Sequence, residues 1–250
     1  MKIAQHSILT VVLFAAFVAP PSVHAFQSPA GQDDSHAAAA ADKEALQACI
    51  AGADKNMTML PTRMPDIPID KLTPAQKDVA FSEFGTQRQT RAPGVVGGPY
   101  LALLRSPEVL RYMKQLNVYL QERSAVPMKL RQFIIMITAR QMSTQYTFHV
   151  HCPQAVKAGI SLETAKAISE GRRPPSMAED EAIVYDFLDE LHRNQSVSDV
   201  TYARALNKFG EQGVIDITSI NGFYTSFLMV ANVARTSWHL NTPSLATFPR

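Results

Sequence analysis

The stretch TQYTFHVHC, Thr144 to Cys152, decides the fold because it fits two secondary structures. In a strand, its apolar and polar residues alternate, so that one face is apolar and the other polar. His149 and His151 then point the same way and could chelate a metal. Pro153 favours the strand, because the residue before a proline avoids helical geometry.

In a helix, the two histidines lie about 200° apart and cannot bind one metal. Thr144, Thr147 and His151 then line one face, with Phe148 beside them. The residues on both sides favour helix, and no second strand is in sight. Unpaired backbone groups cost about 1–3 kcal/mol each when buried, whereas strand propensity spans only about 1 kcal/mol. The stretch is therefore predicted to be helical, with Pro153 as a point where the helix could kink.

Helix signals recur along the rest of the chain. N-cap residues and prolines open apolar segments, and glycines close several of them. Starts are predicted at Thr73-Pro74, Ser106-Pro107, Pro127, Ser161, a capping box Ser176–Glu179 and Ser198, with a long buried helix from Val214 to Ala234. No clear hairpin or strand–helix–strand pattern occurs. We predict an all-α fold of roughly seven or eight helices.

The N-terminus has the layout of a secretory signal peptide. Lys2 precedes an apolar run from Ile8 to Val18, then two prolines and small residues before Ala25. The prediction is cleavage after Ala25 and export to the periplasm or outside, with a retained anchor as the alternative. No later segment is expected to span a membrane. The predicted organisation is a signal peptide at 1–25, a flexible arm at 26–60 with a short helix from Asp42 to Ala51, a helical domain at 61–240 and a tail at 241–250.

Composition excludes one class of partner. The net charge is +2 and only 18% of residues are charged, without a basic block, so no nucleic-acid partner is expected. Cys49 and Cys152 are the two cysteines. Export would permit a disulfide between them, but two buried, apolar thiols are the favoured interpretation.

Three segments carry a resemblance to a known family. They are GGPYLALLRSPEVL, KLRQFIIMITARQMSTQYTFHVHCPQAVKAGIS and FGEQGVIDITSINGFYTSFLMVANVA. The chain from Met64 to Ala234 resembles the carboxymuconolactone decarboxylase family, which is related to alkylhydroperoxidase-like proteins. The resemblance implies an alkylhydroperoxidase-like helical subunit that forms homo-oligomers, often trimers or hexamers, acts on a small-molecule substrate and needs no cofactor or metal.

The family's functional pattern carries over only in part. His151 matches the motif histidine, whereas Thr147 and Gln132 stand where decarboxylase-like members have glutamates. The Cys-x-x-Cys of the peroxidase branch is replaced by Thr144 and Thr147, so a thiol cycle lacks its paired cysteines.

The resemblance thus makes His151 the expected catalytic residue, because a histidine pKa near 6.5 suits a proton donor. Thr147 and Gln132 would assist as neutral hydrogen-bond donors, and Thr144 and Phe148 would flank the substrate. Arg140 is a candidate clamp for a carboxylate, with a solvated or salt-bridged surface arginine as the alternative.

Several functions remain open from the sequence. The first is a cofactor-independent decarboxylating lyase that acts on a small carboxylated lactone or keto acid, with His151 donating a proton or stabilising the enolate. The second is a non-catalytic helical oligomer that binds a small ligand. The third is a metal protein that uses His149 and His151, and a lesser alternative is peroxidase-like redox activity.

Overall fold

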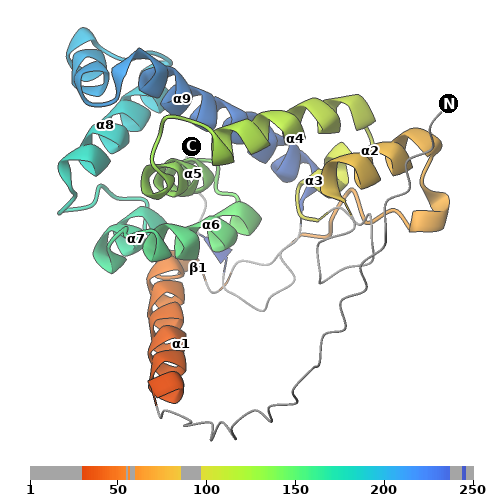
Figure 1. Cartoon of the computed structure of the whole chain (residues 1–250), viewed down its shortest axis with the longest axis horizontal. Helices are drawn as coiled ribbons and strands as arrows, with labels where there is room; N and C mark the ends of the chain where they lie inside the picture. Colours follow the sequence, from red (N-terminus) through yellow and green to blue (C-terminus); the bar gives the residue numbers. More distant parts are fainter. Residues whose placement is uncertain (1–29, 55, 57–59, 86–96, 237–243, 246–250) are drawn as a thin grey trace, which may run out of the picture.

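The computed structural model describes residues 30–54, 56, 60–85, 97–236 and 244–245, and these residues form an all-α fold (Figure 1). The predicted fold class is therefore confirmed. The helices are α1 (Ala30–Cys49), α2 (Pro74–Phe84), α3 (Tyr100–Leu103), α4 (Pro107–Glu122), α5 (Met128–Gln141), α6 (Gln145–Lys157), α7 (Leu162–Ser169), α8 (Glu179–Asn194) and α9 (Asp199–Ala234), with a 3-10 turn at Ile69–Lys71. Two short strands, β1 (Ala53–Asp54) and β2 (Ser244–Leu245), pair antiparallel. The predicted signal peptide at 1–25 lies outside the described residues.

The ambiguous stretch is helical, as predicted. It forms most of α6, which contains Pro153 and begins after Thr144. The two histidines bind different partners: His149 Nδ1 lies 2.9 Å from the Gln145 carbonyl oxygen, and His151 Nδ1 faces α5. The strand needed for a metal site formed by both histidines is therefore absent from this stretch.

Helix α5 is the centre of the molecule. It packs against α6, α7, α8 and α9, and Phe133 to Met136 are fully buried. A helix enclosed on most sides normally carries apolar residues all round. Buried Gln132, Thr138 and Arg140 break that pattern, which marks them for closer inspection.

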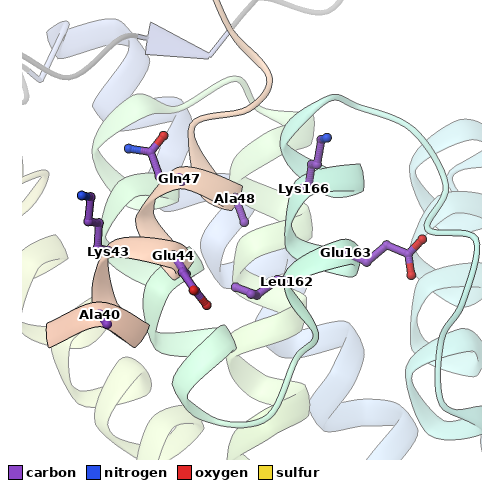
Figure 2. A pocket seen from close by; sticks show the side chains of 8 residues that line it. All are labelled: Ala40, Lys43, Glu44, Gln47, Ala48, Leu162, Glu163 and Lys166. Atoms are coloured by element: carbon purple, nitrogen blue, oxygen red, sulfur yellow. The ribbon is translucent and has the colours of Figure 1, made fainter. Parts of the chain in front are cut away.

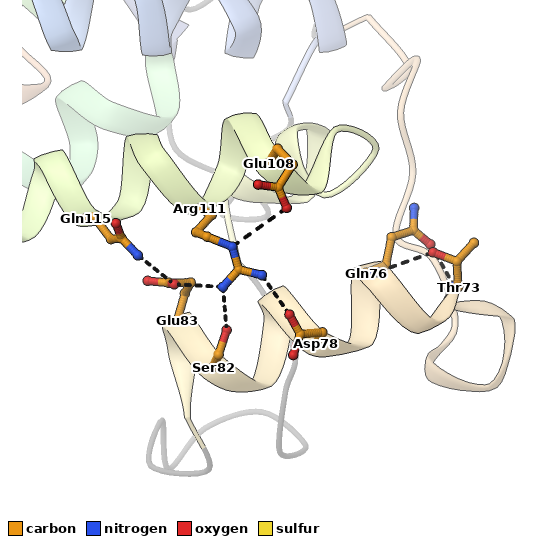
Figure 3. Close-up of polar contacts among 8 residues, drawn as sticks. All are labelled: Thr73, Gln76, Asp78, Ser82, Glu83, Glu108, Arg111 and Gln115. Atoms are coloured by element: carbon orange, nitrogen blue, oxygen red, sulfur yellow. Dashed lines mark hydrogen bonds and ion pairs between the residues drawn. The ribbon is translucent and has the colours of Figure 1, made fainter.

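Local sequence signals set several helix starts. Thr73 forms a capping box with Gln76 (Figure 3), and the hydroxyls of Ser161 and Ser198 accept from the backbone N–H three residues later. The capping box predicted at Ser176 is wrong. Helix α8 starts after Ala178, whose backbone N–H donates to the Glu181 carboxylate at 3.3 Å.

Arg111 makes several of the polar contacts that hold helix α2 to α4. Arg111 of α4 pairs with Asp78 at 2.6 Å and with Glu83 at 3.4 Å (Figure 3). It also donates to the Ser82 hydroxyl. This partly exposed network fixes α4, which supplies one wall of the site described below.

Two predictions about the N-terminal region are corrected. The described part of the expected flexible arm contains α1. This helix extends further toward the N-terminus than the predicted short helix, and its C-terminal end meets α6 and α7 (Figure 1). Cys49 at that end forms a disulfide with Cys152 of α6 instead of remaining a thiol. Both cysteines are fully buried, and the fold brings their Cα atoms to 5.9 Å, within bridging distance.

Helix α9 joins two predicted helices into one element. Gly210 has positive φ (68°) and marks the kink between the segment from Asp199 and the predicted helix from Val214 to Ala234. By length and composition α9 could cross a membrane, contrary to the prediction that no later segment could. However, 56% of its most apolar window is buried against the protein, as in the core helix of a globular domain.

Candidate active site

His151 and Gln132 meet where α5 and α6 pack together. The two helices are joined by a short turn in which Ser143 adopts a left-handed conformation (φ 48°). This turn folds α6 back along α5, and His151 Nδ1 then lies 2.8 Å from Gln132 Oε1. The structure therefore brings together two of the predicted site residues.

Two glutamine amides connect His151 to Tyr224 of α9. Gln132 Nε2 donates to Gln121 Oε1 at 3.4 Å, and Gln121 Nε2 donates to the Tyr224 hydroxyl at 3.0 Å. Because Gln132 Oε1 is an acceptor, His151 Nδ1 carries the ring proton and Nε2 keeps a lone pair. The Tyr224 hydroxyl accepts from Gln121, so its own proton is available to a ligand.

We call this hydrogen-bonded chain the relay; its members are His151, Gln132, Gln121 and Tyr224. Its hydrogen bonds can run in either direction, which gives the relay a second allowed polarity. Rotating both amides by half a turn reverses every hydrogen bond. His151 then presents Nε2–H, and Tyr224 presents an oxygen lone pair. In either polarity the relay offers one neutral donor and one neutral acceptor.

Burial keeps both ends of the relay neutral. It lowers the pKa of His151 to about 4, so the imidazole is uncharged at neutral pH. Burial is also the main cause of the raised pKa of Tyr224, with Tyr100 adding to it and the hydrogen bond from Gln121 opposing it. These environments correct the expectation of a histidine with a pKa near 6.5 that stores a proton for donation.

The relay ends border a cavity of about 280 Å³ between α3, α4, α6 and α9. Tyr100 and Phe227 form an aromatic wall, with ring centroids 4.7 Å apart. Gly98, in the predicted Gly-Pro loop, has positive φ, and a Cβ there would come within 2.4 Å of the Tyr146 ring. The sequence Gly-Gly-Pro thus allows the loop to approach Tyr146 at the cavity edge.

Polar groups complete the cavity. Thr147 lines it one helical turn before His151. Asn117 also lines the cavity, and its buried Oδ1 has no hydrogen-bond partner among the described residues. Among the described lining residues, Lys114 is the cation and Glu122 the carboxylate.

The other predicted site residues lie elsewhere. Gln132 sits behind His151 and does not line the cavity, so it positions the imidazole. Thr144 precedes α6 and hydrogen-bonds Asn232 at 3.3 Å, while Phe148 is fully buried in the core. Arg140 is eight residues beyond Gln132, about 12 Å along α5, and borders a different cavity. The expectation of a carboxylate clamp by Arg140 beside His151 is therefore wrong.

Sequence analysis missed Tyr224, Gln121 and Lys114. Gln121 and Asn117 are four residues apart on α4 and share a face with Lys114, which was a usable signal for a polar helix face. Tyr224 offered no such signal, because it lies within an apolar segment and becomes part of the site only when α9 packs beside α4.

A second depression lacks such chemistry. It lies between α1 and α7 (Figure 2), where Leu162 points toward Glu44 while Lys43 and Gln47 point away. Its wall is mostly aliphatic carbon, and it contains no histidine, tyrosine or buried amide. The cavity beside His151 is therefore the better candidate for catalysis.

Comparisons with known proteins support the fold. No protein-family profile and no curated protein sequence matches the chain. Among solved structures, the debrominase Bmp8, crystallised as a cysteine-to-alanine variant in complex with 2,3,4-tribromopyrrole, is similar with a TM-score of 0.53 over 72% of this chain and 93% of its own. This chain therefore shares its fold with that debrominase. Sequence identity is 14%, so the likeness concerns the fold and leaves the reaction of this chain open.

Proposed function

We propose that this chain is a cofactor-independent lyase that decarboxylates a small carboxylated lactone or keto acid. The observation that carries the proposal is the relay, which provides a neutral donor and a neutral acceptor at one cavity wall. Preorganised hydrogen bonds of this kind stabilise a developing charge without the reorganisation that water would need. The similarity to an enzyme fold supports catalysis in general.

The first step needs an anchored carboxylate. Lys114 at the cavity edge supplies the positive charge, in the role that sequence analysis gave to Arg140. The carbon–carbon bond to the carboxylate breaks, CO₂ leaves, and the electron pair moves into the conjugated carbonyl group.

The relay then handles the enolate. The Tyr224 hydroxyl donates a hydrogen bond to the enolate oxygen and keeps its proton, because burial raises its pKa. His151 Nε2 accepts a hydrogen bond from a water molecule, and that water gives its other proton to the substrate carbon. The hydroxide that remains combines with the released CO₂ and leaves as bicarbonate. In the reversed polarity, His151 Nε2–H stabilises the enolate instead.

Release of CO₂ from a panel of carboxylated lactones and β-keto acids tests the proposal. Tyr224→Phe removes only the hydroxyl, and His151→Ala removes the imidazole. We expect each to lower kcat by roughly 10²–10⁴, the usual contribution of a positioned proton-transfer or enolate-stabilising group. Tyr202→Phe is the matched control, because Tyr202 is an exposed tyrosine on the same helix and its loss should leave the rate unchanged.

Three outcomes would change the assignment. Equal rates for wild type and Tyr224→Phe would remove Tyr224 from the chemistry. A folded wild type without turnover, but stabilised by a panel compound, would favour the non-catalytic binding protein. Loss of bromide from 2,3,4-tribromopyrrole, the ligand in the Bmp8 structure, would point to another reaction. Peroxidase-like activity is disfavoured, because both cysteines are buried in their disulfide.

A further inference from the structure

The cavity that Arg140 borders has a volume of about 640 Å³ and opens at the C-terminal end of α5. Helices α5 and α8 and the turn after α7 form its walls. Four guanidinium groups border it, against one carboxylate; these lining residues are Arg140, Arg172, Arg173, Arg193 and Asp189. Its volume is in the range that holds small organic ligands.

The neighbouring carboxylates do not balance this positive charge. Arg172 pairs with Glu170 at 2.5 Å, and Arg193 pairs with Asp189 at 3.2 Å. Arg173 pairs with Asp186, but Asp186 also pairs with Arg204 at 3.1 Å. Three carboxylates thus face five guanidinium groups in and around the cavity.

Arg140 is the buried member of this set. It is 5% exposed, and burial alone accounts for the lowered pKa of its guanidinium group. The end of a helix favours a cation through the helix dipole. Its guanidinium group places positive charge on the buried part of the cavity wall, where hydrogen bonds from a charged donor are strong.

His192 adds a neutral donor to the wall. Asn221 Nδ2 lies 2.7 Å from His192 Nε2 and 2.9 Å from the Thr138 hydroxyl. The amide therefore donates to Nε2, and the ring proton resides on Nδ1. No described residue hydrogen-bonds Nδ1, so this N–H remains available to a ligand. Buried Asn221 and Thr138 thus orient His192 and give this part of the cavity wall a defined geometry.

We propose that this cavity binds a small oxyanion, carboxylate or phosphate, at a site separate from the relay. Guanidinium groups bind such planar or tetrahedral oxygen groups through paired N–H donors. The two cavities share no lining residue, so anion binding here is independent of the lyase proposal. Absence of decarboxylase activity would therefore not contradict the proposed anion site.

Isothermal titration with inorganic phosphate and, separately, succinate tests the proposal. Ionic strength is held constant with NaCl, because general screening would otherwise mimic binding. We expect saturable one-to-one binding of one or both probes, and which one binds more tightly identifies phosphate or carboxylate as the ligand chemistry. Arg140→Met should raise Kd by about tenfold or more, since a lost charged hydrogen bond contributes 1.5–3 kcal/mol.

Two further variants keep the test decisive. Arg172→Gln alters the exposed cavity edge and should weaken binding even if Arg140→Met does not fold. Arg131→Met removes an arginine from the same helix outside the cavity and should leave Kd unchanged. Absence of saturable binding by wild type, or equal Kd values in all variants, would overturn the proposal. Arg140 would then serve only to stabilise the end of α5.

Discussion

At the scale of single residues, His151 owes its chemistry to its surroundings. An imidazole in water has a pKa near 6.5, whereas burial here lowers it to about 4. Gln132 hydrogen-bonds Nδ1 at 2.8 Å and so leaves Nε2 as the ring nitrogen for the ligand. A residue expected to act as a proton donor thus becomes a neutral base or a neutral hydrogen-bond donor.

The lowered pKa predicts how stability depends on pH. Between pH 6.5 and about 4, the unfolded chain protonates this histidine while the folded protein does not. Its contribution to the free energy of unfolding is therefore complete above pH 6.5 and falls as the pH drops toward 4. From pH 7 to pH 5 we expect a loss of up to about 2 kcal/mol from this residue.

Urea unfolding of wild type and His151→Asn at several pH values measures the loss. The asparagine variant lacks the titrating group, so its stability should fall less over the same pH range. Parallel curves for the two proteins would contradict a strongly lowered pKa for His151.

At the scale of elements, the disulfide decides the place of α1. Cys49 is the last residue of α1, and Cys152 lies in α6 beside His151. Gly52 follows the bridge and approaches α7 so closely that a Cβ would lie 1.9 Å from the Ser169 carbonyl oxygen. Its backbone N–H donates to the Ser169 hydroxyl at 3.0 Å. These contacts hold the C-terminal end of α1 against the helical domain.

Removing the disulfide should therefore loosen α1. We expect the double variant Cys49→Ala, Cys152→Ala to lose about 2–4 kcal/mol of unfolding free energy. Hydrogen exchange should rise in α1 more than in α5. A reducing agent should destabilise wild type by a similar amount and leave the double variant unaffected. Equal stability of wild type in both redox states would show that the bridge contributes nothing.

At the scale of the whole molecule, α9 leaves one face uncovered and without charge. The exposed positions along it from Ile215 to Val233 are Ile215, Thr218, Gly222, Ser226, Met229, Asn232 and Val233. The charged residue of this stretch, Asp216, is buried and accepts from the Ala125 backbone N–H at 2.7 Å. A long uncharged surface of this kind is typical of a subunit interface.

We propose that this face of α9 joins copies of the chain into the homo-oligomer expected from the family resemblance. Light scattering of the protein expressed without residues 1–25 should give the mass of a trimer or hexamer. Met229→Glu would bury a charge in the interface and should shift the mass toward a monomer. Val200→Glu, at an exposed apolar position before the kink, should leave the mass unchanged. A monomeric wild type would contradict the proposal.

Local signals predicted most of the fold. Thr73, Ser161 and Ser198 each cap a helix through a contact with the residue three positions later. The continuous apolar run of α5 predicts a buried helix. The ambiguous α6 was assigned through context, because a single strand would leave its backbone groups unpaired. The capping box predicted at Ser176 is wrong, although the sequence there has the same local pattern as a real cap.

The candidate site was also predicted only in part from the sequence. The sequence by itself determined the helical fold class, and its resemblance to a known family singled out His151 and Gln132, which the structure places 2.8 Å apart. Tertiary structure alone decided that Tyr224 and Gln121 complete the relay, that Arg140 belongs to another cavity and that Cys49 meets Cys152. Each of those relationships joins or separates residues on different elements through packing, and burial, which moves the pKa of His151, exists only after the chain has packed.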